Sequence, residues 1–445
     1  MDSAKAYFKG KKVTVLGLGL LGKGLGDTAF LAHCGAQVTV TDLKDAKALA
    51  SSVAQLKKYK NVRFVLGRHD LSDFQNCDMV LKAQGVPLDS IYVAEARKNN
   101  IPIRMDDELL VSLLPKNVKV IGITGTRGKT TVTSLIYHIL KKAGKRVHLG
   151  GNIRGVATLS LLPKIKSGDY VVLELSSWQL QGFGEQKISP NVSVFTNFMP
   201  DHMNYYKNNL KDYFADKAFV FKYQKESDTL IAGESVVKKI PKSFKGNLVV
   251  GGDVPKSWKL PLPGEHNKEN IALAVSAARA LNIPLSKIKS GVESFKAVEG
   301  RLQLVKTVRG IQIYNDNNST TPEATIAGLR AFAPVESLKS KVKRVVLIMG
   351  GADKGLDMTE LVKTAQEYAH TIILLPGTGS EKLKAQSSKL QAYYAESLKD
   401  AVETAVASAS KGDVVLFSPA FASFGLFVNE YDRNDQFLTL VKKIK

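Results

Sequence analysis

Short apolar runs alternate with glycine-containing turns and longer amphipathic segments along almost the whole chain. The first run, Lys12–Leu16, precedes a glycine turn and a helical pattern that ends near His33, and a second apolar run follows at 37–41. Runs of this length between turns are typical of buried strands, and strands that alternate with helices usually pair in parallel. The pattern therefore predicts an α/β protein whose parallel sheets carry helices on both faces.

The alternation falls into three blocks, and 445 residues are too many for one ordinary hydrophobic core. We expect domains at 1–112, 113–298 and 299–445. Further strands are expected in the second domain at 117–123, 147–150, 170–175, 192–197 and 229–233. In the third domain they are expected at 312–315, 344–349, 371–375 and 413–417. No short repeat of fixed period is present, which argues against a solenoid.

The chain is strongly basic, with 63 lysine and arginine residues against 41 acidic residues and a formal net charge of +22. The lysines lie in short scattered clusters and do not alternate with aromatic residues, as a groove for a nucleic-acid strand would require. We therefore expect lysine-covered surfaces and an anionic small-molecule substrate, with no nucleic-acid partner.

The two cysteines, Cys34 and Cys77, are too few for a disulfide framework and fit a reducing compartment. No apolar stretch approaches the roughly 20 residues that a membrane helix needs, so no membrane insertion is expected. The apolar segment 13–21 resembles the core of a signal peptide, but it is rich in glycine and no cleavage site follows it. The chain is expected to be a cytoplasmic monomer.

The segment 123–131 reads Ile-Thr-Gly-Thr-Arg-Gly-Lys-Thr-Thr and lies between a predicted strand and a predicted helix. Backbone N–H groups of such a loop surround phosphate oxygens, and the helix N-terminus adds a favourable dipole. We expect Lys129 to reach the β- and γ-phosphates of ATP and the hydroxyl of Thr130 to hold Mg²⁺. Ile123 stands where a strict Walker A sequence has glycine, so the alternative is a plain glycine-rich turn with a surface lysine. The remaining residues of the expected loop are Gly125, Thr126, Arg127, Gly128 and Thr131.

A second glycine motif, Gly17-x-Gly19-x-x-Gly22, directly follows the first predicted strand, and Asp42 ends the next strand. By itself this pattern predicts a dinucleotide site, which makes an NAD-dependent oxidoreductase the alternative class of enzyme. The same backbone geometry binds any pyrophosphate, including that of a UDP-sugar. The second nucleotide loop at Lys129 and the lack of an evident hydride-transfer site favour the UDP-sugar. The residues expected at this site are Gly17, Gly19, Leu20, Leu21, Asp42, Gln84 and Gly85.

An ordered series of short segments accompanies the two loops. They are Gly-Asn-Ile at 151–153, Glu-Leu-Ser-Ser-Trp-Gln at 174–179, Asn-x-x-x-Asp-His at 197–202, Pro-Gly-Glu-His-Asn-x-x-Asn at 263–270, Gly-Arg at 300–301, Asn-Asp at 315–316, Gly-Gly-x-x-Lys at 350–354 and Ser-Pro-Ala-x-Ala-Ser at 418–423. From residue 12 to the C-terminus, this series resembles the Mur ligase family and its folylpolyglutamate synthase relatives. The resemblance implies a Rossmann-like N-terminal domain for the UDP moiety, a central P-loop ATPase-type domain and a Rossmann-like C-terminal domain for the amino acid.

The resemblance further implies an activity. The segments at 174–179 and 418–423 are similar to those of the glutamate-adding type. That type ligates glutamate to UDP-N-acetylmuramoyl-L-alanine through an acyl phosphate, with ATP and Mg²⁺, in peptidoglycan precursor synthesis. D-glutamate is favoured over L-glutamate. The alternatives are an L-glutamate-adding or other Mur ligase, a folylpolyglutamate synthase-like ligase, and a non-catalytic nucleotide-binding relative.

Roles for individual residues also come from the resemblance. The catalytic residues would be Lys129, Glu174, His202 and Lys217, and Mg²⁺ would be held by Thr130, Glu174, His202 and Lys217, the last as a carbamate. ATP would contact Asn267, Asn270, Arg301 and Asp316, and the other substrates would contact Asn152, Ser177, Gln179, Lys354, Ser423 and Phe424. Helix patterns alone would make Lys217 a surface lysine and Asn267 a helix N-cap.

Two departures from the family pattern fall in the third domain. The segment 316–321 reads Asp-Asn-Asn-Ser-Thr-Thr, where a lysine is often found, so one cation near ATP is missing and Arg127 is expected to replace it. Glu430 occupies a position where an aromatic residue is expected beside the amino acid. Either Glu430 turns away and pairs with Arg433, or the amino acid binds in another orientation.

Overall fold

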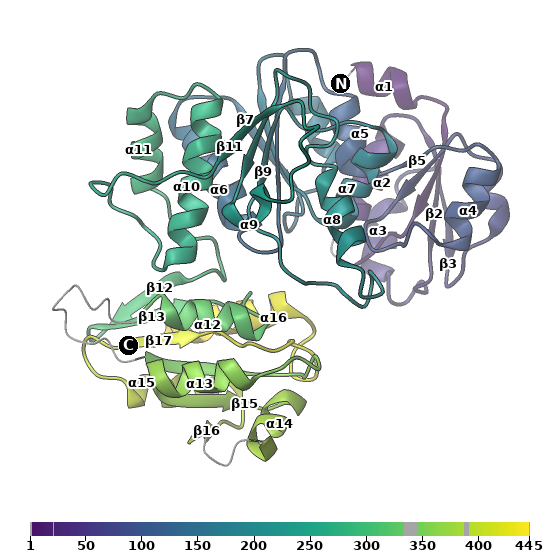
Figure 1. Ribbon diagram of the computed structural model, residues 1–445. Helices are drawn as coiled ribbons and strands as arrows, with labels where there is room; N and C mark the ends of the chain where they lie inside the picture. The colour runs from purple at the N-terminus through teal and green to yellow at the C-terminus, as the bar shows by residue number, and fades with distance from the viewer. Residues whose placement is uncertain (1, 21, 333–344, 387–390, 445) are drawn as a thin grey trace. The chain divides into compact units, whose positions relative to one another are not determined.

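The computed structural model describes residues 2–20, 22–332, 345–386 and 391–444. The chain forms two compact units, one made of Met1–Pro255 and Asn270–Gly291, the other of Lys256–Glu269 and Val292–Lys445. Each of the three sheets lies within one of the three expected domains, and the first two sheets share the first unit (Figure 1). Leu21, expected at the nucleotide site, lies outside the described residues.

The first sheet has five parallel strands in the order β3-β2-β1-β4-β5. Its strands are β1 (Lys12–Leu16), β2 (Gln37–Asp42), β3 (Val62–Leu66), β4 (Met79–Lys82) and β5 (Ile103–Arg104), and its helices are α1 (Asp2–Phe8), α2 (Lys23–His33), α3 (Ala50–Leu56), η1 (Leu71–Phe74), α4 (Ile91–Lys98) and α5 (Asp106–Ser112). The order runs outward from β1 in both directions, to β2 and β3 on one side and to β4 and β5 on the other. Such a reversal leaves a crevice above the carboxyl ends of β1 and its neighbours, where ligands bind in α/β proteins.

The second sheet has six parallel strands in the order β11-β10-β9-β6-β8-β7. Its strands are β6 (Lys119–Thr124), β7 (Val147–Gly151), β8 (Tyr170–Glu174), β9 (Val192–Phe195), β10 (Thr229–Ala232) and β11 (Asn247–Val250), and the helices of this part of the chain are α6 (Lys129–Lys142), η2 (Leu159–Lys164), α7 (Ser177–Glu185), α8 (Leu210–Ala218), α9 (Glu234–Val237), α10 (Glu265–Ala280) and α11 (Leu285–Glu293). Because β6 pairs with both β8 and β9, the segments that leave these three strands meet at one edge of the sheet.

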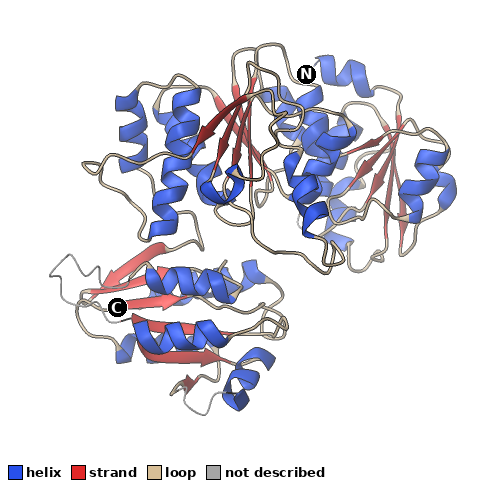
Figure 2. Ribbon diagram, viewed as in Figure 1, coloured by secondary structure: helices blue, strands red, loops and turns tan. Residues whose placement is uncertain are grey.

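The third sheet, in the second unit, has six strands in the order β12-β13-β17-β14-β15-β16. Its strands are β12 (Gln303–Val308), β13 (Ile311–Asn315), β14 (Val345–Gly350), β15 (Ala369–Leu375), β16 (Tyr393–Tyr394) and β17 (Val414–Phe417), and its helices are α12 (Pro322–Arg330), α13 (Thr359–Tyr368), α14 (Thr378–Gln386), α15 (Leu398–Ser408) and α16 (Glu430–Lys443). Figure 2 shows helices on both sides of this sheet.

The central strand β14 shows why the apolar runs are continuous. Leu347 and Met349 pack in the core that α12 and α13 share, whereas Val346 and Ile348 pack in the core that α15 and α16 share. A parallel strand covered on both faces needs apolar side chains at every position, so it lacks the polar alternation of a half-exposed strand.

The expectation of purely parallel sheets is wrong for one pair, because β12 runs antiparallel to β13. The two strands are joined by Arg309 and Gly310, with φ angles of 50° and 80°. Two consecutive left-handed residues form the tight turn that matches the twist of a hairpin. A two-residue connection leaves no room for the crossover that a parallel pair requires.

None of the described helices is long and apolar enough to cross a membrane. Cys34 is buried, Cys77 is partly buried, and both thiols are free.

Candidate functional site

The phosphate loop joins β6 to α6 and is braced by the segment that follows β9. The backbone N–H of Thr126 donates to the carbonyl of Asn197 at 2.9 Å, and that of Arg127 donates to the Asn197 side-chain oxygen at 2.8 Å. The hydroxyl of Thr196 donates to the carbonyl of Arg127 at 2.5 Å. These contacts hold the loop open ahead of the α6 N-terminus, as an anion site requires.

Two lysines converge on one carbonyl oxygen of this loop. Nζ of Lys129 donates to the carbonyl of Gly125 at 3.0 Å, and Nζ of Lys217, from α8, donates to the same oxygen at 2.9 Å. The two nitrogens are therefore no more than about 6 Å apart, a distance at which like charges strongly oppose each other's ionisation.

Lys217 is buried, with only 2% of its surface exposed, so the alternative of a surface lysine is wrong. Burial, and then the charge of Lys129, lower the pKa of Lys217 well below its usual value. Tyr213 lies against it, with Nζ 4.7 Å from the centre of the ring. Both effects favour the neutral form of this amine, and a neutral amine is a nucleophile.

Glu174 ends β8 beside the phosphate loop and is 3% exposed, which contradicts a solvent-facing role. Oε1 accepts a hydrogen bond from the Asn152 side chain at 3.2 Å, and the Asn152 backbone N–H donates to the Glu174 carbonyl at 2.8 Å. Oε2 is buried and has no hydrogen-bond partner. A buried carboxylate oxygen without a partner is costly, and a bound cation would satisfy it.

The segment that braces the loop continues to Asp201 and His202. Asp201 forms an ion pair with Arg127 at 2.6 Å, which offsets the positive charge that Arg127 was expected to supply to ATP. The His202 ring lies against Trp178, with ring centres 4.7 Å apart. Burial lowers the pKa of His202, and Lys129, Lys217 and Arg127 add to this effect, while Asp201 opposes it. His202 is therefore neutral at neutral pH and lies within the field of both lysines.

These side chains suit a cation that is bound partly by phosphate. Within the described ranges, no group of three or more His, Cys, Asp and Glu side chains is arranged to hold a metal ion. Mg²⁺ normally takes only one or two carboxylates from a protein and completes its shell with water and substrate phosphates. Oε2 of Glu174 fits that requirement, and Thr130, the second residue of α6, carries a hydroxyl of the kind Mg²⁺ accepts. The His202 ring offers nitrogen, which Mg²⁺ disfavours.

Asn267 and Asn270 are both buried in α10. Asn267 is not the N-cap of this helix, because it is the third helical residue and its amide donates to the carbonyl of Pro263 at 2.7 Å. Asn270 lies against the phosphate loop, where a Cβ built on Gly128 would approach its side-chain oxygen to 2.2 Å. Gly128, at φ 81°, therefore lets Asn270 come close to the phosphate position.

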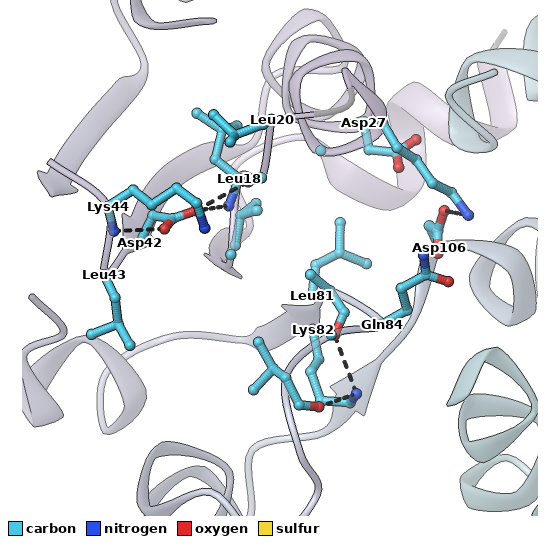
Figure 3. Close-up of a pocket in the computed structure, with 18 of the residues that line it drawn as sticks. Leu18, Leu20, Asp27, Asp42, Leu43, Lys44, Leu81, Lys82, Gln84 and Asp106 are labelled. Carbon is cyan, nitrogen blue, oxygen red and sulfur yellow. Dashed lines mark hydrogen bonds and ion pairs between the residues drawn. The ribbon is translucent and has the colours of Figure 1, made fainter. Parts of the chain in front are cut away.

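The first sheet carries a cavity of about 430 Å³ above the ends of β1, β2 and β4. The sequence predicted a set of residues at this site, and all of them that lie in the described part of the chain line the cavity. They are Gly17, Gly19, Leu20, Asp42, Gln84 and Gly85. In Figure 3, Asp42 and Lys44 lie at one end of the cavity, and Asp27 and Asp106 lie at the opposite end.

The side chain of Asp42 holds the backbone of the glycine loop in place. Oδ2 accepts hydrogen bonds from the backbone N–H groups of Leu18 and Gly19 at 2.9 and 3.0 Å, and Oδ1 accepts one from Lys44 at 2.9 Å (Figure 3). The structure gives Asp42 a role in shaping the loop, and its expected contact with the nucleotide stays a prediction, since Asp42 also lines the cavity. Both oxygens are already engaged by the backbone.

A buried ion cluster connects this cavity with the second sheet. Nζ of Lys23 lies 2.7 Å from Asp106 and 3.2 Å from Asp107, and it donates to the carbonyl of Gly151 at 3.3 Å. Burial disfavours the charge of Lys23, but Asp106, Asp107 and Asp27 outweigh burial and raise its pKa. Gly151 directly precedes Asn152, so the cavity is linked through the backbone to the neighbourhood of Glu174.

Ser177 and Gln179 lie in the first turn of α7 and are buried. The side-chain oxygen of Gln179 accepts a hydrogen bond from the Ser176 N–H at 2.9 Å and completes a capping box, and its amide donates to Asp107. The structure therefore gives Gln179 a supporting role, in which it joins α7 to α5, in place of the expected substrate contact.

In the second unit, the carboxylate of Asp316 is turned inward. Oδ1 accepts a hydrogen bond from the backbone of Leu302 at 3.1 Å, and Oδ2 accepts from the hydroxyls of Ser319 and Ser418 at 2.6 and 3.0 Å. Burial raises the pKa of Asp316 to about 6. Asp316 thus holds the Arg301–Leu302 turn to two loops at the end of the sheet, and the expected contact with ATP would require it to give up one of these hydrogen bonds.

Lys354, Ser423 and Phe424, which are expected to contact the substrates, lie in or beside the loops that Asp316 joins. Nζ of Lys354 donates to the carbonyl and the hydroxyl of Thr320 at 3.0 and 3.1 Å. Ser423 is buried, whereas Phe424 is 65% exposed.

Arg433 is fully buried. Its guanidinium donates hydrogen bonds to the side-chain oxygen and the backbone carbonyl of Asn317 and to the backbone carbonyl of Phe421. No ion pair joins Arg433 to Glu430 among the described residues, so the expected pairing is not formed; Glu430 instead accepts a hydrogen bond at its backbone carbonyl from Asn317 at 2.9 Å. Burial lowers the pKa of Arg433 to about 10, with Glu430 opposing the shift.

Several residues of the site were missed by sequence reasoning. They are Lys23, Asp27, His69, Lys82 and Asp106 in the lining of the cavity, and Trp178 against His202. Lys82 is 1% exposed, and its ammonium donates to the carbonyls of Ala83 and Val86. A lysine at the end of an apolar run was the available signal, since a lysine there is either at the surface or held by carbonyl groups.

The chain matches family models over most of its length. They are described as Mur ligase MurD-like, N-terminal domain (residues 11–105), Mur ligase middle domain (123–243) and Mur ligase, glutamate ligase domain (300–421).

Among curated relatives, UDP-N-acetylmuramoylalanine--D-glutamate ligase of Borreliella burgdorferi is 35% identical, over 97% of both chains. The protein of that name from Clostridium kluyveri is 33% identical, over 99% of this chain and 98% of its own. Among solved structures, the UDP-N-acetylmuramate-alanine ligase MurC of Thermotoga maritima is similar, with a TM-score of 0.61 and 19% identity over 98% of this chain and 100% of that one. MurF of Thermotoga maritima, in complex with ADP, has a TM-score of 0.61 at 18% identity, over 99% of this chain and 96% of its own. At these identities the two structures show a shared fold.

The contacts of Gln179 generate a prediction about stability. Gln179→Ala should lower the free energy of unfolding by about 1–3 kcal/mol, because it removes the capping interaction and leaves Asp107 with one buried hydrogen bond fewer. Chemical denaturation measures the change. Gln55→Ala is the matched control, since Gln55 is exposed and bonds only within its own helix, and its effect should stay within about 0.5 kcal/mol. Equal stability of the two variants would contradict the supporting role of Gln179.

Proposed function

The chain belongs to the Mur ligase family, and we propose that it ligates D-glutamate to UDP-N-acetylmuramoyl-L-alanine with ATP, in the cytoplasm, for peptidoglycan precursor synthesis. The observation that carries the proposal is the shared contact of Lys129 and Lys217 with Gly125, at the edge of the sheet where β8 ends in Glu174, in the same unit as a nucleotide-sized cavity. Relatives at this level of identity bear the name of that ligase. Family membership also removes the oxidoreductase alternative that the first glycine motif left open.

The proposed reaction has two chemical steps. A carboxylate oxygen of the alanyl group attacks the γ-phosphorus of ATP, the bond to ADP breaks, and an acyl phosphate forms. The amine of glutamate then attacks the acyl carbon and loses a proton, and inorganic phosphate leaves as the amide forms. The first step brings two anions together, so it depends on fixed positive charge. Lys129 and the N-terminus of α6 supply that charge.

Mg²⁺ fits the donors present, with the unpartnered oxygen of Glu174 and the hydroxyl of Thr130 as its protein ligands. When bound, it would withdraw charge from the phosphate oxygens during transfer. His202 and Asn152 are assigned to hold the acyl end of the substrate, because His202 is neutral and Asn152 is fixed by Glu174.

A carbamate on Lys217 is part of the proposal. The neutral amine would attack carbon dioxide, form an N–C bond and release one proton, leaving two oxygens and one negative charge. That change turns a repulsion with Lys129 into an attraction and provides oxygen ligands for a second Mg²⁺. The support is the burial of Lys217, its lowered pKa and its shared contact with Gly125.

The UDP moiety is assigned to the cavity of the first sheet, and the muramoyl-alanine end to the side linked by Lys23 to Gly151. Glutamate is assigned to Lys354, Ser423 and Phe424 in the second unit, where Lys354 provides a cation for a carboxylate. Asn270 in the first unit, together with Asn267, Arg301 and Asp316 in the second, is assigned to ATP. Asp316 would need to exchange an internal hydrogen bond for the ribose.

The decisive experiment supplies the purified chain with ATP, Mg²⁺ and UDP-N-acetylmuramoyl-L-alanine, and with labelled D- or L-glutamate in competition. Phosphate release and chiral analysis of the product should show D-glutamate in the product. Exclusive use of L-glutamate would keep the assignment as a glutamate ligase and change only the assigned enantiomer. The acidic side chain of Glu430 would explain that result. Phosphate release with neither enantiomer would overturn the proposal.

Lys129→Ala should reduce ligation at least about 1000-fold, because the lysine offsets charge on the transferred phosphate. Steady-state phosphate release measures the loss. Lys142→Ala, at the exposed end of the same helix, should retain nearly full activity. An Lys129→Ala protein with normal circular dichroism and normal turnover would exclude this role.

Lys217→Ala should lose most activity, and small carboxylates such as acetate or formate should restore part of it by replacing the carbamate. Carbon NMR of the wild-type protein under labelled carbon dioxide should show a carbamate signal that Lys217→Ala lacks. Lys211→Ala, on the exposed start of the same helix, is the control and should keep both signal and activity. A wild-type protein without the signal would refute the carbamate.

A further inference from the structure

Arg433, on α16, is the largest side chain that the described part of the chain buries completely, with 1% of its surface exposed. Within the described ranges its guanidinium forms no ion pair, and Glu430 acts on it only through its charge. A buried charge is costly unless hydrogen bonds satisfy it. The acceptors of Arg433 therefore show which parts of the second unit depend on this charge.

The guanidinium bridges two loops at one end of the third sheet. Nε and Nη2 donate to the side-chain oxygen and the carbonyl of Asn317 at 2.8 and 3.0 Å, and Nη1 donates to the carbonyl of Phe421 at 3.2 Å. Asn317 follows β13 and Phe421 follows β17, and these strands are parallel neighbours. The planar fork of an arginine can hold acceptors in two directions at once, which the compact ammonium of a lysine cannot do with the same geometry.

Asn317 extends this link to a third segment. Its amide donates to the carbonyl of Glu430 at 2.9 Å, in the first turn of α16, and its backbone N–H donates to the Asn315 side chain at 3.1 Å. Asn434, next to Arg433, accepts a hydrogen bond from the Asn315 amide at 2.9 Å. Two consecutive residues of α16 thus tie this helix to the end of β13.

The two loops also touch without Arg433. Oδ2 of Asp316 accepts from the hydroxyl of Ser418 at 3.0 Å, and the N–H of Ala420 donates to the carbonyl of Ser319 at 2.8 Å. These contacts join one loop to the other. Arg433 adds the attachment of both loops to α16, through one group that bonds both of them at the same time.

Each loop carries residues assigned to a different substrate under the proposed function, on which this inference rests. Asp316, assigned to ATP, directly precedes Asn317. Ser423 and Phe424, assigned to glutamate, follow Phe421 by two and three positions. A shift of either acceptor of the guanidinium would therefore displace residues on the ATP side or on the glutamate side.

We propose that Arg433 is a positioning residue for two substrates, because its guanidinium fixes the ATP-side loop and the glutamate-side loop on α16. Since Arg433 is fully buried, it acts through these loops and not by touching a substrate. Without the guanidinium, carbonyl oxygens of both loops lose their partner, and the two loops loosen together. A binding site tolerates displacements of only about 0.5 Å, so this loosening weakens the binding of both substrates.

Steady-state kinetics of the full-length chain with Arg433→Met tests the proposal, because methionine fills much of the same space without any donor. The KM for ATP and the KM for glutamate should each rise at least about 10-fold. The KM for UDP-N-acetylmuramoyl-L-alanine, whose UDP moiety is assigned to the first unit, should stay within about twofold of the wild-type value.

A loss of folded protein alone would lower the apparent kcat and leave all three KM values unchanged, and that pattern would overturn the proposal. A rise in the KM of only one of ATP and glutamate would overturn the double role. Arg330→Met is the matched control, because Arg330 is an exposed arginine at the end of α12 in the same unit, and its three KM values should equal those of the wild type.

Arg433→Lys keeps the charge but loses the planar fork, so the KM for ATP and the KM for glutamate should rise severalfold. Wild-type KM values in this variant would contradict the bridging geometry.

Asn317→Ala leaves Arg433 in place and decides the question if neither Arg433 variant folds. It removes the acceptor of Nε and the donor to Glu430 but keeps the Asn317 carbonyl. The same two KM values should rise severalfold with an unchanged circular dichroism spectrum, and unchanged KM values would refute the link through Asn317. A wild-type chain that ligates glutamate, with normal KM values in all these variants, would refute only this inference. A wild-type chain that releases no phosphate would refute the proposed function.

Discussion

The carbonyl oxygen of Gly125 accepts hydrogen bonds from the amino groups of two lysines, and the edge of the second sheet that we propose as the catalytic site is arranged around that shared contact. Two cations so close together, one of them buried and the other partly buried, are unfavourable unless something offsets them. Lys129 is offset by the carbonyls of its own loop, whereas Lys217, deeper in the fold, is driven toward the neutral amine. The same concentration of positive charge would favour a triphosphate and a carboxylate coming together. The arrangement that is electrostatically costly by itself is thus the one that the proposed chemistry requires.

The ion cluster of Lys23 with Asp106 and Asp107 has the complementary role of fixing distances. It joins α2 and α5 to the strand end at Gly151, and Gln179 ties α7 to Asp107. The first and second sheets consequently form one compact unit. A substrate anchored in the cavity of the first sheet would then present its far end to Glu174 at a set distance, without any domain movement within this unit.

Much of the fold could be predicted because its strands are buried on both faces. β14 is apolar along its length, and β6 and β8 are apolar apart from the charged or polar residues at their ends. The length of each apolar run and the glycines beside it were therefore sufficient to predict these strands. β11 was missed although three of its four residues are apolar, and the structure leaves all four exposed at the edge of the sheet. β4 was missed because it is short and ends in Lys82, whose charged group only the folded chain can satisfy. The hairpin of β12 and β13 depends on the backbone of Arg309 and Gly310, which an apolar pattern does not report.

The sequence by itself determined the two phosphate-binding loops, the strands that carry them and the family to which their spacing belongs. Loop chemistry is local, since small residues between a strand and a helix are enough to specify it. Only the tertiary structure decided what the polar side chains do. Gln179 meets Asp107 from 72 positions away, and Lys217 meets Gly125 from 92 positions away. Asp42 turned out to support the glycine loop, because burial forces each polar atom to find a partner and that partner can come from any part of the chain.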